Sequence, residues 1–479
     1  MGKKIMIFLT AWICFFLIPT AVPASDVIEN NNSGIPDQEL YQSILEELGK
    51  KPNQTFTKQE AEKIQVLTAV FREVKSLKGI KYLKNLKVLN IEGNNLKSLK
   101  GMQDLKGLET LYARSNSIKN LKPLKKLKNL KHLYCRRNQI ETLKGIEKLK
   151  KLETLDASYN RLTSIKETRG LKNMGYLDLS ANEITSVKPL KNLKKVKKLF
   201  LSYNKLNSLN GMEKLTRITY LDARGNRLTS IKQLKKLKKL RKLYIKENQL
   251  ADLKGIEALV NLKYLNASSN QLRNIQGIQK LEKLWYLNLG RNCLVSAGEI
   301  AKLKKLRILE LSFNKLSSLP DFSKIRHLTG FGIIFNHLSL EEISRKTPKY
   351  LFLDDWEEYL KVMALVQNVD YTLQFTEPSD ITQIHKNMKR IAGHAYMPNA
   401  VVRMIISRTR RDDDGDCEVI LREVRVDENG NFVFDNLNFD QLEPGYDYFI
   451  AFDIDYDFYK VTTDTDYYYD PSLRWYRIN

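Results

Sequence analysis

One stretch of the sequence decides the fold: Leu130-Lys-His-Leu133-Tyr-Cys135-Arg-Arg-Asn138-Gln-Ile140-Glu-Thr-Leu143. Asparagine recurs at a constant interval of 22 residues from Asn94 to Asn336, twelve times in all, and the same leucine frame surrounds it each time. A fixed period of roughly 20 to 50 residues indicates a chain built from stacked, similar coils. The period therefore predicts a solenoid over residues 84–338.

Within each coil the residues before the asparagine alternate between inward and outward positions, as in Leu221-Asp222-Ala223. Period-2 alternation predicts a short strand, so stacked coils form a parallel sheet on the concave side of a horseshoe. The asparagine follows the strand, and its amide both donates and accepts hydrogen bonds. A ladder of asparagines can therefore satisfy buried backbone groups coil after coil, without binding a ligand. Frame and period are those of a leucine-rich repeat, an α/β solenoid.

Turn residues stand seven positions after many of the asparagines. They are Gly101, Pro123, Gly145, Pro189, Gly211, Gly255 and Gly277. The segments after these turns are rich in lysine, as in Leu234-Lys-Lys-Leu-Lys-Lys-Leu240. The leucines point inward and the lysines outward, which makes the convex side basic. These lysines serve solubility, or they contact anionic polymers or membrane surfaces, and both interpretations stay open.

Residues 1–24 have the pattern of an export signal. Lys3 and Lys4 precede an apolar run from Ile5 to Ile18, and small residues ending at Ala24 suit a cleavage site. The alternative is an uncleaved membrane anchor, although the run is short for a span. No later stretch approaches the ~20 apolar residues of a transmembrane helix, so we expect a soluble, secreted mature protein. Residues 25–35 are polar, and we expect them to be frayed.

Charge divides the chain in two. Residues 25–339 carry 62 Lys and Arg against 28 Asp and Glu, a net of +34, whereas residues 340–479 carry 16 against 27, a net of −11. This asymmetry predicts separate domains and makes anionic partners of the basic half conceivable. Cys135, Cys293 and Cys417 form no disulfide framework, and we expect Cys135 to act as a small apolar side chain inside the solenoid.

A helical cap is expected before the repeats, because an open solenoid end exposes its apolar core. The apolar residues between Pro36 and Leu48 form one helical stripe. A second helix begins at Thr57, with Glu60 completing a capping box. Arg72 stands where the first coil would carry its asparagine, so residues 25–83 are interpreted as lead-in, cap and one atypical coil.

The repeat frame ends after Asn336. Ser339 and Glu342 predict a capping box and a closing helix to Arg345, and residues 354–366 predict a helix or strand-like material, so that 339–366 form a C-terminal cap. Residues 367–479 carry short apolar runs separated by turns, which predict an all-β sandwich. The expected strands are 401–406, 417–426, 432–434 and 446–454, with a hairpin-type turn at 427–431.

Two outward columns, four and six residues before each asparagine, carry aromatics in eight of nine consecutive coils, and the ninth has Tyr159 beside its asparagine. With strands ~4.8 Å apart, they would form a track of roughly 40 Å on the concave face. The candidate ligand-binding residues are Tyr112, His132, Tyr134, Tyr159, Tyr176, Phe200, Tyr220, Tyr244, Tyr264 and Tyr286. A charged rim is expected from Arg114, Arg136, Arg137, Arg224, Lys242 and Lys246. Such surfaces are typical of protein binding, although strand propensity alone also favours aromatics.

No pattern predicts catalysis, a cofactor or a metal ion. The five histidines are scattered and no nucleophile or second ligand accompanies them. The acidic residues 412–416 lack the spacing of a calcium loop and are interpreted as a solvated hairpin tip. Asp453, Asp455 and Asp457 alternate along one strand, as a solvated face or a cation site. Nucleic acid is not an expected partner, because the protein is exported and its basic charge is spread over the repeats.

Three motifs, Ile35-Pro36-Asp37, Leu48-Gly49-Lys50 and Thr57-x-x-Glu60, lead into the 22-residue repeats. With these motifs, residues 35–340 resemble the secreted internalin-like proteins of Gram-positive bacteria. The tail is similar to bacterial immunoglobulin-like modules in Ile391-Ala-Gly-His-Ala-Tyr-Met397, Val426-Asp-Glu-Asn-Gly-Asn-Phe432 and Leu442-Glu-Pro-Gly445. The resemblance implies a cap, a horseshoe and an immunoglobulin-like domain. It also implies a concave face that binds a protein, often a host surface receptor, in cell adhesion and virulence.

Two functions follow from these observations. The first is a secreted, monomeric, non-enzymatic adhesin that captures a protein ligand on its concave face. The second is an envelope-associated structural protein, held to anionic wall polymers or lipid headgroups by its basic convex side. The sequence shows no Leu-Pro-x-Thr-Gly sorting signal, so we expect release or electrostatic retention rather than covalent attachment to the wall.

Overall fold

The computed structural model describes residues 26–348, 374–377, 389–394, 401–410, 413–427, 429, 431–437, 446–455 and 476–477. The chain divides into two compact units, Met1–Leu162 and Thr163–Asn479, and each is described by itself. The expected export signal and the expected helix at 354–366 lie outside the described residues.

The cap before the repeats contains both expected helices. Helix α1 (Gln38–Glu47) begins at Asp37, whose carboxylate accepts a hydrogen bond from the N–H of Leu40. Helix α2 (Lys58–Ala61) begins with the expected capping box, in which Thr57 and Glu60 each accept the other's backbone N–H through their side chains. The capping-box prediction is confirmed, although α2 is a single turn long.

The lead-in is more ordered than its polar composition suggests. Strand β1 (Val27–Ile28) pairs antiparallel with β2 (Phe56–Thr57). Ile28 and Ile35 are buried, and the side chain of Asn31 accepts hydrogen bonds from two backbone N–H groups of the following turn. The expectation that residues 25–35 are frayed is therefore wrong, because two apolar side chains and an asparagine-centred turn fix the segment against the cap.

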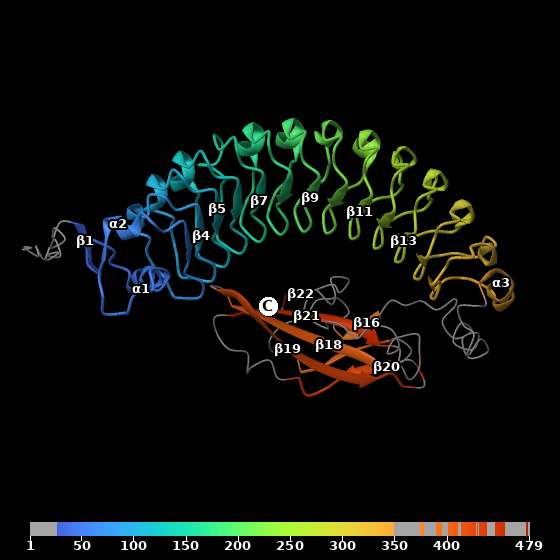
Figure 1. Ribbon diagram of the computed structural model, residues 1–479. Coiled ribbons are helices and arrows are strands. Elements are labelled where there is room, and N and C mark those ends of the chain that lie inside the picture. The colour runs from blue at the N-terminus through green and yellow to red at the C-terminus, as the bar shows by residue number, and fades with distance from the viewer. Residues whose placement is uncertain are drawn as a thin grey trace, which may run out of the picture. The chain divides into compact units, whose positions relative to one another are not determined.

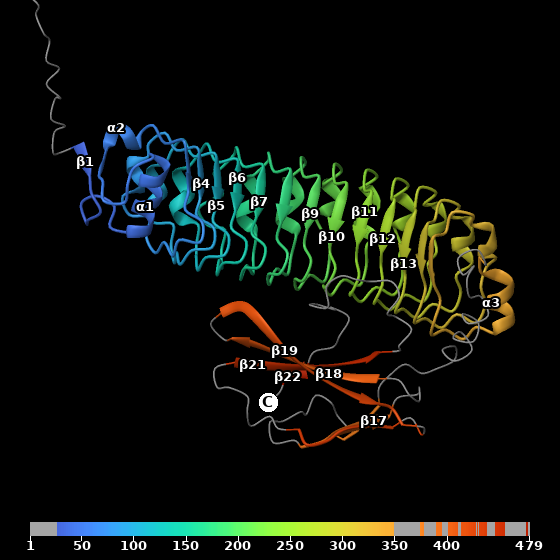
Figure 2. The same ribbon diagram turned by 60° about the horizontal axis from the view of Figure 1, so that its bottom comes forward.

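Thirteen parallel strands of the described residues follow one another in chain order within one sheet. Each has three residues, as the alternation predicts, and Figure 2 shows neighbouring strands side by side. They are β3 (Val66–Thr68), β4 (Val88–Asn90), β5 (Thr110–Tyr112), β6 (His132–Tyr134), β7 (Thr154–Asp156), β8 (Tyr176–Asp178), β9 (Lys198–Phe200), β10 (Tyr220–Asp222), β11 (Lys242–Tyr244), β12 (Tyr264–Asn266), β13 (Tyr286–Asn288), β14 (Ile308–Glu310) and β15 (Gly330–Gly332).

Short 3-10 helices complete the coils on the side opposite the strands (Figure 1). They are η2 (Ile80–Tyr82), η3 (Met102–Asp104), η4 (Lys122–Lys126), η5 (Lys166–Gly170), η6 (Lys188–Asn192), η7 (Met212–Lys214), η8 (Lys232–Lys236), η9 (Ile256–Ala258), η10 (Ile278–Lys280), η11 (Gly298–Lys302) and η12 (Phe322–Lys324). The turn glycines before several of them have left-handed φ, as Gly101 at +110° and Gly211 at +101° do, which an L side chain rarely adopts. The expected turn chemistry is confirmed.

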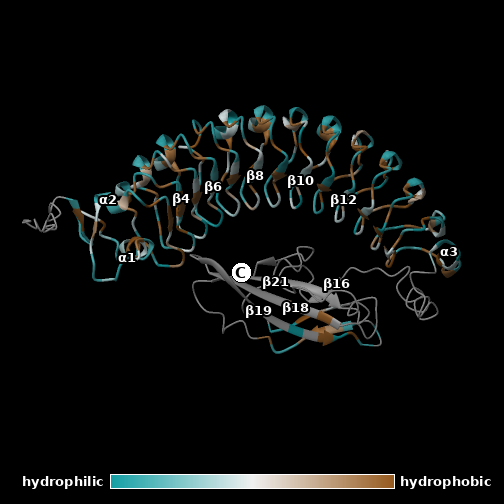
Figure 3. Cartoon of the chain, viewed as in Figure 1, coloured by the Kyte–Doolittle hydropathy of each residue, from teal (hydrophilic) through white to brown (hydrophobic). Residues whose placement is uncertain are grey.

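The core of each coil is a set of inward apolar side chains, one from each recurring position. In the coil that contains β10 and η8, seven such side chains are at most 1 % exposed: Leu221, Ala223, Leu228, Ile231, Leu234, Leu237 and Leu240. Figure 3 shows hydrophilic colour on the 3-10 helices and hydrophobic colour inside the coils. Cys135 is buried at the expected inward position.

The asparagine ladder has the geometry that its periodicity predicts. The Nδ2 group of Asn226 donates to the carbonyls of Leu201, Ala223 and Arg224, at 2.9, 3.1 and 3.1 Å, and its Oδ1 accepts the N–H of Leu206 at 3.0 Å. The residue before each asparagine is left-handed, as Tyr203 is at φ +52°, and this turns the chain away from the strand. Within each unit the asparagines thus bond their own coil to the preceding one.

The end of the repeats is closed by α3 (Leu340–Lys346), as expected. Ser339 accepts the N–H of Glu342. The carboxylate of Glu342 accepts the N–H of Leu319 in the last coil and pairs with Lys346 at 2.7 Å. The first turn of the helix is therefore bonded directly to the coil that it covers.

The tail forms two small antiparallel sheets, consistent with the immunoglobulin-like sandwich that its sequence predicts. One sheet has the order β16 (Gln374–Glu377), β17 (Ile391–His394), β20 (Asn431–Phe434). The other has the order β19 (Asp413–Arg425), β18 (Val401–Arg410), β21 (Tyr446–Asp455), β22 (Tyr476–Arg477).

Two details of the tail differ from the sequence-based expectation. The turn from Asp427 to Asn431 is tight, with Asp427 N–H donating to Asn431 O at 2.8 Å, but β19 and β20 belong to different sheets, so it is not a hairpin. The β18–β19 register pairs Arg410 with Asp413. Residues 413–416 therefore belong to the strand rather than to a hairpin tip, and residue 412 lies outside the described residues.

Candidate functional site

The outward face of the sheet carries the predicted aromatic columns. In β10 the middle residue, Leu221, is fully buried, and Tyr220 and Asp222 stand on the opposite face. The parallel register places Tyr220 beside Lys198 of β9 and Lys242 of β11. Strand alternation and constant register therefore place the first and third strand residues on one surface, as the sequence predicts.

Six rings of the second unit form one continuous series of contacts, here called the aromatic ladder: Tyr176, Phe200, Tyr220, Tyr244, Tyr264 and Tyr286. Successive ring centroids are 5.3, 4.8, 5.4, 4.7 and 3.9 Å apart. The rings are half-buried. Aromatic pairs at such separations stabilise by about 0.5–1.5 kcal/mol beyond the area that they bury, so the ladder is a pre-ordered surface.

The register of the strands explains why the rings meet. Phe200 and Tyr244 occupy the third position of their strands, and their partners in the ladder occupy the first, so most contacts are diagonal and the rings are tilted by 35–42°. Tyr264 and Tyr286 stand directly opposite each other, and they stack with an interplanar angle of 7°. The ladder therefore zigzags between the two outward columns.

Burial raises the pKa of the Tyr220 and Tyr264 hydroxyls above the ordinary tyrosine value. Hydrogen bonding among neighbouring hydroxyls adds to the effect, from Tyr244 for Tyr220 and from Tyr286 and Tyr244 for Tyr264. The raised pKa keeps the Tyr220 and Tyr264 hydroxyls uncharged at neutral pH.

This raised pKa leads to a test of stability against pH. Because the neutral phenols are favoured in the folded state, their contribution is complete below about pH 10, the ordinary tyrosine pKa, and is lost as pH rises above it. We expect the Tm to fall as pH rises beyond about 10, and the double variant Tyr220→Phe/Tyr264→Phe to fall less steeply. Calorimetry with tyrosinate absorbance checks this. Identical slopes in the two proteins would contradict it.

Trp285 joins the ladder, although the outward columns do not include it. Its ring lies edge-on at 6.1 Å from Tyr264 and from Tyr286. It stands seven residues before Asn292, directly before β13, and therefore outside the two columns at four and six residues before each asparagine. Its place directly before Tyr286 in the sequence was the available signal.

The expected charged rim is partly neutralised. Arg224 forms a bidentate pair with the buried carboxylate of Asp222, at 2.7 Å, and its guanidinium lies 5.6 Å from the ring centre of Tyr244. Lys246 pairs with Glu247 at 3.1 Å. Lys242, by contrast, is exposed at the first position of β11. Arg224 therefore packs against the ladder at Tyr244, whereas Lys242 is a rim cation that is exposed to solvent.

The first unit carries a smaller cluster of the same kind. Tyr112 and Tyr134 stack at 4.8 Å and 3°. Arg114 lies over Tyr134 at 4.8 Å and pairs with the buried Asp156 at 3.3 Å, repeating the arrangement of Arg224. The Nδ1 atom of His132 lies 3.1 Å from the hydroxyl of its strand neighbour, Thr154. These predicted residues are brought together as a second, shorter aromatic surface.

Tyr159 lies in a different column from the other candidates. It is the left-handed residue before Asn160, with φ +53°, and 46 % of its surface is exposed. The guanidinium groups of Arg136 and Arg137 lie 4.6 and 5.8 Å from its ring centre. Tyr159 therefore lies beside its asparagine and outside the two outward columns, as its place in the sequence predicts, and the coil of Asn160 places Thr154 and Asp156 in those columns.

The described residues contain neither a cluster of metal ligands nor a helix that could span a membrane. Among the residues that the structure describes, no three His, Cys, Asp or Glu side chains lie together as metal ligands. In the same part of the chain no helix has the length and apolarity needed to cross a membrane. Of the alternating aspartates, Asp453 and Asp455 lie in β21, and Asp457 lies outside the described residues.

Comparison with known proteins concerns the repeats. A family model described as leucine rich repeats (2 copies) matches residues 106–148, 150–192, 216–258 and 238–283, and one described as leucine rich repeat matches 172–228. No curated protein matches the sequence significantly.

Solved structures agree with these matches. A Leptospira interrogans leucine-rich repeat protein is 31 % identical over 58 % of this chain and 74 % of its own, with a TM-score of 0.54. The internalin InlF of Listeria monocytogenes is 26 % identical over 68 % of this chain and 97 % of its own, with a TM-score of 0.64. The functional domain of InlJ from Listeria monocytogenes, at 16 % identity, covers 89 % and 95 % with a TM-score of 0.51 and shares the fold. The chain therefore belongs to the leucine-rich repeat proteins, and it is similar to the internalins.

Proposed function

We propose that this chain binds a protein ligand on the outward face of its sheet, over the aromatic ladder. The observation that carries the proposal is the continuous contact of six rings from β8 to β13. Exposed aromatic area rimmed by charge is typical of protein interfaces, and tyrosine, tryptophan and arginine dominate their binding energy. Because the rings hold one another in place, little side-chain entropy is lost when a partner covers them.

The ring geometry favours a protein over a glycan. Sugars stack on free faces of aromatic rings, whereas the faces of Tyr264 and Tyr286 lie against each other at 3.9 Å. The rings are half-buried, so a ligand meets part of each ring and its hydroxyl rather than a free, flat face. Apolar side chains can pack on the rings, and backbone groups can bond the hydroxyls, as in other tyrosine-rich binding surfaces.

The charges beside the ladder indicate the electrostatic character of the partner. Lys198 and Lys242 are exposed at the first positions of β9 and β11, between the rings of the ladder. On the other side Asp222 is neutralised by Arg224. The surface is therefore apolar at its centre and basic at its edge, and it suits an acidic protein face.

We further propose that the chain works outside the cell, as a secreted adhesin that captures a host surface protein. Support for export is the pattern of residues 1–24, and support for the role is the likeness of the repeats to internalins. The mature N-terminus is expected at Ser25. Mass spectrometry of the protein from culture medium tests this. A chain that keeps residues 1–24 and stays with the membrane would refute it.

The binding proposal is tested by affinity capture with the full chain from host-cell and envelope extracts. The ladder variant Tyr176→Ser/Phe200→Ser/Tyr220→Ser is expected to lose at least 100-fold in affinity for the captured protein, because hot-spot aromatics each contribute about 2 kcal/mol or more.

The matched control is Phe71→Ser/Val295→Ser, which removes two exposed apolar side chains, 75 % and 58 % exposed, outside the ladder. It is expected to bind as the unaltered chain does. Circular dichroism confirms that each variant is folded. Equal capture by the ladder variant and the unaltered chain would remove the basis of the proposal.

A further inference from the structure

A groove of about 900 Å³ lies on the 3-10 side of the second unit, on the face away from the strands. Its lining comes from η5 to η8, and one carboxylate, that of Glu213, contributes to it. Six of the lining side chains are cations, and we call the site the lysine groove: Arg169, Lys188, Lys191, Lys232, Lys235 and Lys236.

The repeat explains how these cations come to lie along one line. Arg169, Lys191 and Lys235 each stand nine residues after an asparagine of the ladder, and Lys188 and Lys232 each stand six after one. Equal positions of successive coils lie side by side, so the two sets run in the stacking direction over four coils. The coil of Asn204 contributes Glu213 and Asn210 at these positions, and the other three coils contribute cations. The groove therefore presents six cations and one carboxylate along the stacking direction.

Most of the cations in the lysine groove have no acidic partner among the described residues. Within the described part of the chain, none of Lys188, Lys191, Lys232 and Lys235 makes an ion pair. The carboxylate of Glu213 accepts the N–H of Gly211 at 2.8 Å, which fixes it to the backbone. Other lysines are paired, as Lys205 is with Glu183. A hollow lined by one sign of charge attracts counter-ions more strongly than scattered charges do.

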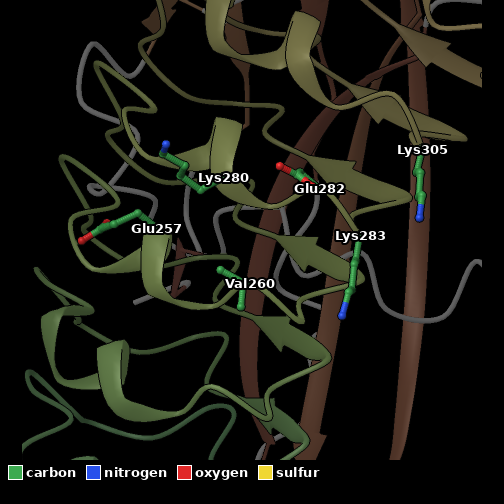
Figure 4. Close-up of a pocket in the computed structure, with 6 residues that line it drawn as sticks. All are labelled: Glu257, Val260, Lys280, Glu282, Lys283 and Lys305. Atoms are coloured by element: carbon green, nitrogen blue, oxygen red, sulfur yellow. The ribbon is translucent and has the colours of Figure 1, made fainter.

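A second hollow on the same side, of about 580 Å³, provides a comparison. Figure 4 shows Glu257 and Glu282 among the lysines that line it. Those lysines are Lys280, Lys283 and Lys305. The Nζ atom of Lys283 donates to Asn261 at 2.6 Å. Acidic and basic side chains are mixed in this second hollow. Lysines among the lining residues therefore do not by themselves make a hollow as strongly positive as the lysine groove.

We propose that the lysine groove binds a linear phosphodiester polymer of the poly(glycerol phosphate) type, laid across the coils. Lysine ammonium groups act as point charges for phosphate, and five of the six cations are lysines. No aromatic side chain lines the groove among the described residues, whereas single-stranded nucleic acid requires aromatic stacking. A flat membrane cannot enter a groove, but a single chain can.

The test is binding of fluorescent poly(glycerol phosphate) to the full chain over a range of NaCl concentrations. Six contacts give an expected slope of log Kd against log salt of about 4, by the single-strand relation of about 0.7 per phosphate. The variant Lys188→Gln/Lys191→Gln/Lys232→Gln/Lys235→Gln is expected to bind at least 10-fold more weakly, with a slope near 1. All four side chains are exposed, so the fold should tolerate the change.

The matched control is Lys280→Gln/Lys283→Gln/Lys305→Gln in the second hollow, which should bind as the unaltered chain does. Equal weakening by both variants would show diffuse charge attraction and overturn the proposal. So would absence of binding at low salt, or stronger binding of heparin, poly(dT) or phosphatidylglycerol vesicles than of poly(glycerol phosphate). None of these outcomes concerns the aromatic ladder, so this test stands apart from that of the proposed function.

Discussion

Replacing Asn226 with alanine is expected to lower the free energy of unfolding by about 4 kcal/mol, because a buried N–H left unpaired costs about 1–3 kcal/mol and each further lost hydrogen bond about 0.5–1.5 kcal/mol. The amide of Asn226 makes four hydrogen bonds, to three carbonyls and to the N–H of Leu206. The residue is 8 % exposed, so water cannot replace the lost amide without opening the coil. Alanine therefore leaves the Leu206 N–H of the preceding coil without a partner. The Leu201 carbonyl keeps one amide donor, that of Asn204 at 3.1 Å, and loses the other.

Urea denaturation followed by circular dichroism measures the loss. Asn192 provides the control, since it is an exposed asparagine at the end of η6, and its replacement by alanine should change stability by less than about 0.5 kcal/mol. Hydrogen exchange should also accelerate at Leu206 and its neighbours in the Asn226 variant. If both variants were equally stable, the asparagine ladder would not be what joins the coils.

Replacing Gly145 with alanine is expected to cost about 3 kcal/mol or more, since backbone strain and overpacking each contribute about 1–3 kcal/mol. Gly145 has φ +114°, outside the range that L residues adopt readily. An added Cβ would also overlap the carbonyl oxygen of Leu121 and lie 2.8 Å from Cα of Lys122, both on the backbone of the preceding coil. Backbone cannot turn aside as a side chain can, so the coils must separate.

Gly107 is the matched glycine in the same unit. A Cβ there would meet Leu86 O at 3.5 Å and Lys84 O at 3.7 Å, which are ordinary contacts. Gly107→Ala should therefore be neutral, or stabilise slightly by about 0.5 kcal/mol through the unfolded state. Thermal melts of both variants decide the matter. A loss at Gly107 equal to that at Gly145 would mean that general crowding, not the left-handed turn, sets the cost.

The repeat region is predictable from the sequence because the period determines both the type of residue at each position and the face on which its side chain lies. Leu221 and Asp222 differ in facing because a strand alternates, and 22-residue spacing repeats that difference in every coil. The same rule predicts the asparagine bonds, the left-handed glycines and the facing of the ladder residues. It holds because neighbouring coils are constrained by the same backbone geometry.

Features that depend on contacts between positions are not predictable in this way. The diagonal packing of Phe200 against Tyr220, at 4.8 Å, requires the register and the rotamers of both strands. The pairing of Arg224 with Asp222 converts an expected rim charge into a neutral support. In the cap, β1 pairs with β2, which lies 28 residues later in the sequence. The polar composition of residues 25–35 gave no indication of this pairing. In the tail, the turn at Asp427 is local, but the partner of β20 is β17, far away in the chain.

The most direct test of the proposed binding face is site-specific photo-crosslinking in the full chain. Benzoylphenylalanine is placed at Tyr220 in the ladder and, separately, at Lys214, an exposed residue of the 3-10 helix η7. After incubation with the captured protein ligand and illumination, we expect a crosslink from residue 220 and none from residue 214. A crosslink from residue 214 with none from residue 220, while capture persists, would place the ligand on the other face and contradict the proposal.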